Sequence, residues 1–218
     1  MKPFVPLLAA GLLLVGCNAA RVVAPLEKGE WRAGAALGGP QINDARLPLM
    51  SIYTAHGATD RRTDYVGLQL MTAGFQSLQM DAGSLLRISA PGQKGSWTPE
   101  VNAFGGGTLL VGFRDGATRI YPNAGLHTVW NPGWGFKPYL GTDIWVDPTY
   151  RLAEFDQGTL LHPNLHGGLR WMGKRIEAGV EAKWLNPTRT FMVPQQTVPT
   201  FMGPGARGLY FTLAFRIP

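Results

Sequence analysis

The stretch RIEAGVEAKWL, residues 175–185, decides the fold class of this chain. Every second residue is apolar, from Ile176 to Trp184, and the residues between are charged or glycine. Because successive side chains of a β-strand point to opposite faces, this stretch predicts a strand with one apolar and one charged face. The stretch GLYFTLAFRI, residues 208–217, repeats the design.

The same alternation recurs in fainter form along the rest of the chain. It is visible at 31–37, 65–70, 77–83, 109–114 and 161–171, and turn residues separate these stretches. The sequence contains 29 glycines and 17 prolines, which is typical of many strands and turns rather than of helices. We expect an all-β fold, an antiparallel up-and-down β-barrel of about ten strands within a range of eight to twelve. The two longer interruptions, 89–100 and 186–207, are predicted to be loops.

The direction of the apolar faces separates a membrane barrel from a soluble one. A soluble barrel turns them inward, whereas a membrane barrel turns them toward lipid and keeps a polar lumen. The polar faces carry charges of both signs in mid-strand, and runs of about ten residues suit a tilted membrane crossing. Three tryptophans end apolar runs, as residues of an interfacial belt do: Trp130, Trp171 and Trp184. Trp145 also ends a run, but the alternation predicts that its side chain points inward. We therefore predict a transmembrane barrel, with a soluble, lipid-tethered barrel or sandwich as the alternative.

The N-terminal segment has the pattern of a signal peptide. Its apolar run of about a dozen residues is too short for a membrane-spanning helix, which needs about 20. Residues 14–17, LVGC, resemble the lipobox of bacterial lipoproteins, in which the cysteine is acylated and becomes the new N-terminus. The resemblance implies a signal peptide over 1–16 and an acyl anchor at Cys17. Because Asn18 rather than aspartate follows, it also implies sorting to the bacterial outer membrane.

Cys17 is the only cysteine of the sequence. An internal disulfide and a zinc site built from thiolates are therefore excluded. Residues 18–30 are polar and irregular, and we interpret them as a tether to the first strand. The predicted organisation is a signal peptide over 1–16, an acylated cysteine and tether over 17–30, and a barrel domain over 31–218.

The charge pattern restricts the partners. The formal net charge is +6, but the basic residues are scattered and never form a run of four. We expect no nucleic-acid partner, because such partners require clustered cations. Outer-membrane lipid is the predicted neighbour of this surface, with other envelope proteins as further candidates.

The polar faces of the late strands supply the candidate lumen residues. His162 and His166 would lie about 13 Å apart on a strand at ~3.3 Å per residue, too far to share a metal ion. Each of two glutamates has a cation on its own face, which predicts a salt-bridged ladder rather than an acid–base pair. The full set of lumen-facing candidates is His162, His166, Arg170, Arg175, Glu177, Glu181 and Lys183.

No catalytic constellation stands out in the sequence. A hydrolytic barrel needs a serine activated by a histidine, and no serine stands beside a histidine in this sequence. Residues 105–107, GGG, lack the Lys-Ser/Thr of a phosphate-binding loop. We assign no catalytic residue, no metal site and no cofactor, and enzyme activity is left open but disfavoured.

Three functional hypotheses remain open. The first is an outer-membrane β-barrel lipoprotein with a non-catalytic envelope role, as a narrow channel or a structural or partner-binding element. The second is a barrel enzyme that modifies lipid or lipopolysaccharide, with His127, His162 or His166 at the outer rim beside a serine or carboxylate. The third is a lipid-tethered periplasmic barrel that binds an apolar ligand between inward-facing Leu, Phe and Trp side chains.

Overall fold

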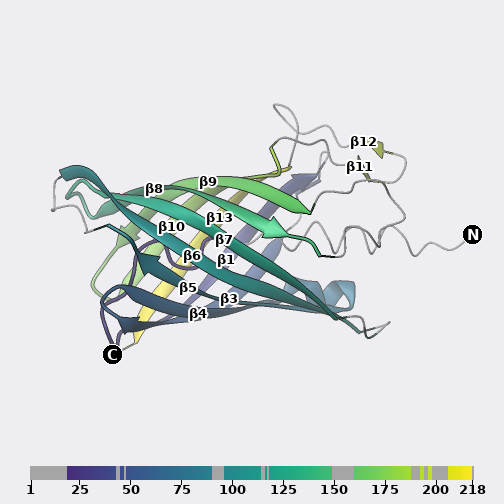
Figure 1. Cartoon of the computed structure of the whole chain (residues 1–218), viewed down its shortest axis with the longest axis horizontal. Coiled ribbons are helices and arrows are strands. Elements are labelled where there is room, and N and C mark those ends of the chain that lie inside the picture. Colours follow the sequence, from purple (N-terminus) through teal and green to yellow (C-terminus); the bar gives the residue numbers. More distant parts are fainter. Residues whose placement is uncertain are drawn as a thin grey trace, which may run out of the picture.

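The computed structural model describes residues 19–42, 45–46, 48–89, 96–113, 116, 118–148, 160–187, 192–193, 196–197 and 206–217. Over these ranges, ten long antiparallel strands form one sheet that closes on itself (Figure 1). The long strands are β1 (Trp31–Ile42), β3 (Leu49–Thr59), β4 (Arg62–Gln69), β5 (Ser77–Arg87), β6 (Ser96–Gly112), β7 (Thr118–Asn131), β8 (Phe136–Val146), β9 (Leu161–Met172), β10 (Ile176–Leu185) and β13 (Ala206–Ile217).

Four short elements lie between the long strands. They are β2 (Ala45–Arg46), the 3-10 helix η1 (Met71–Phe75), β11 (Met192–Val193) and β12 (Gln196–Thr197). Among the described residues, no helix is long and apolar enough to cross a membrane.

The barrel closes through a long seam between its first and last strands. β1 pairs with β13 from Trp31 opposite Ile217 to Gln41 opposite Arg207. Every other long strand pairs with the long strands before and after it in the chain. The prediction of an antiparallel up-and-down barrel of about ten strands is confirmed.

The outer surface of the barrel is apolar and its interior is polar. On β10, Ile176 is 39% exposed while Glu181 on the opposite face is 1% exposed. On β13, Phe211 is exposed on the outside while Thr212 is buried inside. This is the arrangement of a barrel that spans a bilayer, and the reverse of a soluble barrel. The hypothesis of inward-facing apolar side chains around an apolar ligand is therefore wrong.

The two ends of the barrel differ in the length of their connections. We call the end where β1 begins and β13 ends the proximal end, and the opposite end the distal end. The proximal connections are 60–61, 88–95, 132–135 and 173–175, whereas the distal connections include the longer 147–160 and 186–205. The predicted loop at 89–100 is shorter than expected because β6 already begins at Ser96.

Exposed aromatic side chains gather at the proximal end. Trp97 and Trp134 are 64% and 71% exposed, and their ring centroids lie 6.2 Å apart in an edge-on pair. Trp31 and Trp171 are exposed at the same end of β1 and β9. Such rings mark the level of a membrane interface. Trp145, phased inward by the sequence, is buried in the lumen.

Candidate functional site

The first described residues of the chain lie inside the barrel. Residues 19–26, which we call the plug, are irregular in backbone, and all but Ala20 and Pro25 are buried. The sequence interpretation of 18–30 as a tether did not anticipate this, because it overlooked the apolar side chains of the segment. The plug packs on the wall through three apolar clusters. Ala19 contacts Ala36 and Tyr210, and Val23 contacts Val129 and Tyr139. The third cluster contains Val22, Leu26, Ala55 and Leu85.

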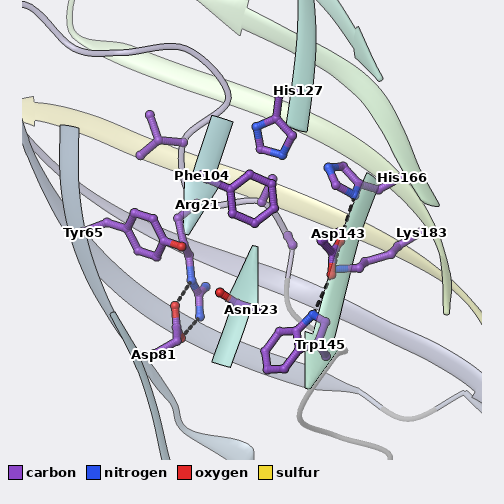
Figure 2. A pocket seen from close by; sticks show the side chains of 13 residues that line it. Arg21, Tyr65, Asp81, Phe104, Asn123, His127, Asp143, Trp145, His166 and Lys183 are labelled. Carbon is purple, nitrogen blue, oxygen red and sulfur yellow. Dashed lines mark hydrogen bonds and ion pairs between the residues drawn. The ribbon is translucent and has the colours of Figure 1, made fainter. Parts of the chain in front are cut away.

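Arg21 makes the strongest polar contact of the plug with the wall. Its Nε donates to Asp81 Oδ2 at 3.0 Å and its Nη2 to Asp81 Oδ1 at 2.7 Å (Figure 2). Its Nη1 donates to Ser51 Oγ. Both side chains of the ion pair are buried. A Cβ at Gly67 would stand 2.8 Å from Asp81 Oδ1 and 2.9 Å from Arg21 Nη2. Glycine at position 67 therefore provides the room that the ion pair occupies.

The backbone of the plug is also held by wall side chains. The Ala20 N–H donates to both Glu181 carboxylate oxygens, at 3.2 and 3.1 Å, and Arg170 Nη2 donates to the Ala20 carbonyl. Tyr139 donates its hydroxyl proton to Glu181 at 2.7 Å. Closer to the proximal end, Asn102 donates to the carbonyl of Val23 at 3.1 Å. These contacts satisfy backbone groups that an irregular buried segment leaves open.

The lumen charges pair across strands, not along one strand as the predicted ladder required. Glu177 contacts Arg170 on β9 at 3.1 Å and also contacts Arg32 on β1. Lys183 pairs with Asp143 on β8 at 3.2 Å. Of these pairs, only Glu177–Arg170 joins neighbouring strands, while each of the other two spans one intervening strand on the inner face of the closed sheet. A pattern read along one strand does not reveal such pairs.

Arg175 is a further correction to the predicted set. It was expected to line the lumen, but it is exposed in the turn between β9 and β10, where its carbonyl accepts the N–H of Arg216 at 2.9 Å. The structure places His166, Arg170, Glu177, Glu181 and Lys183 in buried positions inside the barrel, and His162 in a half-buried one.

A small cavity lies between the plug and the wall. Its volume is about 50 Å³, room for a few water molecules, and Figure 2 shows the side chains around it. Asp143 lines it, with Oδ1 3.2 Å from both His166 Nδ1 and Lys183 Nζ. Its other oxygen accepts the Trp145 indole N–H and the Asn164 amide at 2.7 Å. One buried carboxylate thus holds four neighbours in place.

The structure pairs His166 with His127, not with His162. The two ring centroids are 4.9 Å apart and the rings are nearly perpendicular. A Cβ at Gly141 would stand 2.3 Å from His166 Nε2 and 2.5 Å from His127 Cδ2, so both rings pack over this glycine. His162 instead lies with Nδ1 3.4 Å from the Asn186 amide. Over the described ranges, no group of three or more His, Cys, Asp or Glu side chains could hold a metal ion.

One serine lies near a carboxylate and a histidine, on the outer face of the barrel. Ser84 donates to Asp64, and Asp64 stands opposite His56 in the register of β4 and β3. His56 packs its ring on Trp31 at 4.4 Å. A nucleophilic serine needs a histidine as its proton acceptor, and here the carboxylate takes that place. Among the residues that line the lumen cavity there is no serine.

Sequence reasoning missed the residues that organise the lumen. Asp81 and Asp143 stand on the polar faces of their strands, so the alternation could have added them to the candidates. Arg21 gave no such signal, because it lies in an irregular segment without period.

Comparisons with known proteins concern the fold alone. No family model and no curated protein matches the sequence. Among solved structures, the translocator domain of the autotransporter NalP from Neisseria meningitidis is 10% identical, with a TM-score of 0.48, over 89% of this chain and 91% of that chain. An outer membrane channel from Pseudomonas putida is 12% identical, with a TM-score of 0.45, over 92% of this chain and 100% of that chain. The N-terminal β-barrel domain of Pseudomonas aeruginosa OprF is 10% identical, with a TM-score of 0.35, over 88% and 100%.

Proposed function

We propose that this chain is an outer-membrane β-barrel lipoprotein, acylated at Cys17, with a non-catalytic role as a narrow channel that its own N-terminal segment can close. Cys17 lies outside the described residues, so the anchor rests on the lipobox resemblance of residues 14–17. The membrane assignment is supported by the apolar outer surface and the polar lumen.

The lengths of the connections support one orientation in the membrane. Outer-membrane barrels have short periplasmic turns and longer extracellular loops. The longer connections, 147–160 and 186–205, both join strands at the distal end. The distal end therefore faces outward and the proximal end faces the periplasm.

The observation that carries the channel role is the plug. In the proximal half of the lumen, space is occupied by a chain segment that is not part of the wall, held through Arg21 and the Ala20 backbone. Withdrawal of one polypeptide segment leaves a gap on the order of 5 Å wide, the spacing of neighbouring chains in a sheet. Such a gap admits water and small ions, and a wide general porin is disfavoured.

A structural or partner-binding barrel is the second candidate. The closed lumen favours it, because the cavity beside the plug has a volume of only about 50 Å³. A barrel enzyme is disfavoured, because His127 and His166 lie inside the lumen and Ser84 donates its hydroxyl proton to the Asp64 carboxylate.

Conductance of planar bilayers tests the channel role. The unacylated protein, with Cys17→Ala and a cleavable signal peptide, should not conduct ions above the lipid background. Its Arg21→Glu variant sets two carboxylates against each other at Asp81 and should conduct in small, discrete steps. Thr59→Glu, at an exposed position, is the matched control and should remain silent.

If neither the unacylated protein nor its Arg21→Glu variant conducts ions, the channel role is wrong and the structural role remains. Large steps from the unacylated protein itself would contradict closure by the plug.

A further inference from the structure

Ala19, two residues after the proposed acylation site at Cys17, lies inside the barrel. Ala19 is 3% exposed and packs between Ala36 and Tyr210, which are wall residues of β1 and β13. Cys17 precedes Ala19 by two residues, and two residues span at most about 7 Å. The wall beside Ala19 is a continuous ladder, because β1 pairs with β3 and β13 on its two sides. No route through the wall joins this position to the surrounding lipid.

Because Cys17 is only two residues from Ala19, its acyl chains cannot reach the bilayer while Ala19 stays inside the barrel. They must either leave the bilayer or pull the plug with them. Each methylene group raises the partition constant from water into the bilayer about fourfold. The partition constant of a whole acyl chain is the product of these factors, so it grows steeply with chain length. A typical hydrogen bond contributes a factor of only about 2–12. The plug makes a few hydrogen bonds, one buried two-contact ion pair and three apolar clusters. The transfer of long acyl chains to the bilayer outweighs these contacts, because its fourfold factor applies to every methylene group.

We propose that acylation of Cys17 and insertion of the plug exclude each other, so that the acylated protein holds residues 19–26 outside the lumen at the proximal end. This inference rests on the proposed lipoprotein identity and adds what the anchor does to the lumen. The unacylated protein has the plugged lumen described above, and the acylated protein has a lumen open to the periplasm.

The segment before β1 has a fixed point at Gly29 and is long enough for the plug to leave the lumen. Gly29 has a φ of +83°, and its N–H donates to the Gly57 carbonyl at 2.7 Å at the proximal end. The Gly57 N–H in turn donates to the Glu30 carbonyl at 2.9 Å. Twelve residues separate Cys17 from this point, and about 40 Å of extended chain is ample to reach the proximal membrane interface. Trp31, which marks that interface, follows directly.

Thiol labelling distinguishes the two states, because acylation blocks the only native cysteine. Val22→Cys introduces one free thiol at a buried plug position, and cysteine is small and apolar enough to replace valine there. We would compare the acylated protein with a Cys17→Ala version carrying a cleavable signal peptide, both in proteoliposomes, using a charged maleimide. Mass spectrometry of the N-terminal peptide measures acylation independently.

The expected result is labelling at least tenfold faster in the acylated protein. Thr59→Cys, exposed in both forms, should label equally fast, and Thr108→Cys, buried in the wall, should stay protected in both if the barrel is intact. Equal protection of position 22 with acylated Cys17 overturns the exchange and leaves the lipoprotein standing. An unmodified Cys17 overturns both, and rapid labelling in both forms shows that the plug does not close the lumen at all.

Discussion

The guanidinium group of Arg21 and the carboxylate of Asp81, 60 residues apart in the chain, form a two-contact ion pair inside the barrel. The pair connects the plug to β5 above Gly67, a position where a side chain would collide with both groups. Charged hydrogen bonds of this forked geometry are stronger than neutral ones. We therefore expect the Arg21–Asp81 ion pair, which we call the latch, to hold the plug in the lumen.

Loss of either partner of this latch should loosen the plug. Arg21→Ala or Asp81→Asn leaves its buried partner without its main contact, at a cost of about 3–5 kcal/mol. In the unacylated Val22→Cys protein, each substitution should speed maleimide labelling at least tenfold, and the double variant should be no faster than the single ones. Arg21→Lys keeps the charge without the fork and should give an intermediate rate. Additive effects of the two substitutions would show that the residues act independently.

A methyl group at Gly67 should have the same effect from the wall side. Gly67→Ala places its Cβ within 3 Å of Asp81 and Arg21, so the ion pair must shift. Gly105→Ala on the neighbouring part of the sheet is the control, because its Cβ would have no atom nearer than 3.9 Å. We expect faster labelling of Val22→Cys with alanine at 67 and an unchanged rate with alanine at 105. Equal labelling rates for the two variants would show that the ion pair does not depend on the space at Gly67.

The buried carboxylate of Asp143 should matter for stability more than for plug closure. Asp143→Asn breaks the buried ion pair between this carboxylate and the ammonium group of Lys183, which should cost about 3–5 kcal/mol of unfolding free energy. Urea unfolding in lipid vesicles, followed by the mobility shift on boiling, measures this change. The double variant Asp143→Asn, Lys183→Met removes the ammonium group together with the carboxylate and should recover part of the loss. No recovery would mean that the contacts of Asp143 with Trp145 and Asn164 carry the stability.

The lipid-facing surface predicts a depth-dependent cost for added charge. Val180 lies in the middle of β10 on its outer face, and Val180→Arg should cost about 2–4 kcal/mol and block membrane assembly. Ile176→Arg, at the proximal start of the same strand, should cost about 0–1 kcal/mol because it lies near the interface. Heat-modifiable mobility of outer-membrane fractions reports assembly. Equal assembly of both variants would argue that β10 does not cross the bilayer in this position.

The alternation of apolar and polar residues was sufficient to predict the barrel. A period of two places Ile176 and Val180 on one face of β10, and Glu177 and Glu181 on the other, whatever the rest of the chain does. Charges of both signs in mid-strand, such as Glu181 and Lys183, then indicated which face points into the polar lumen. For the same reason, the burial of Trp145 followed from its phase alone.

The interior of the barrel could not be derived in this way, because its contacts join residues that no local pattern connects. The register between strands brings Lys183 to Asp143 and Glu177 to Arg32, although Arg175 stands nearer to Glu177 in the chain. The plug has no period at all.

The sequence by itself thus determined the strands, their two faces and the approximate strand number, since these depend on the side-chain period of a single extended segment. Only the tertiary structure decided that the chain before β1 turns back into the lumen and that Arg21 meets Asp81 there. The physical reason is that closure of the sheet creates the enclosed space in which charges and bare backbone groups must find partners, and those partners come from strands distant in the chain.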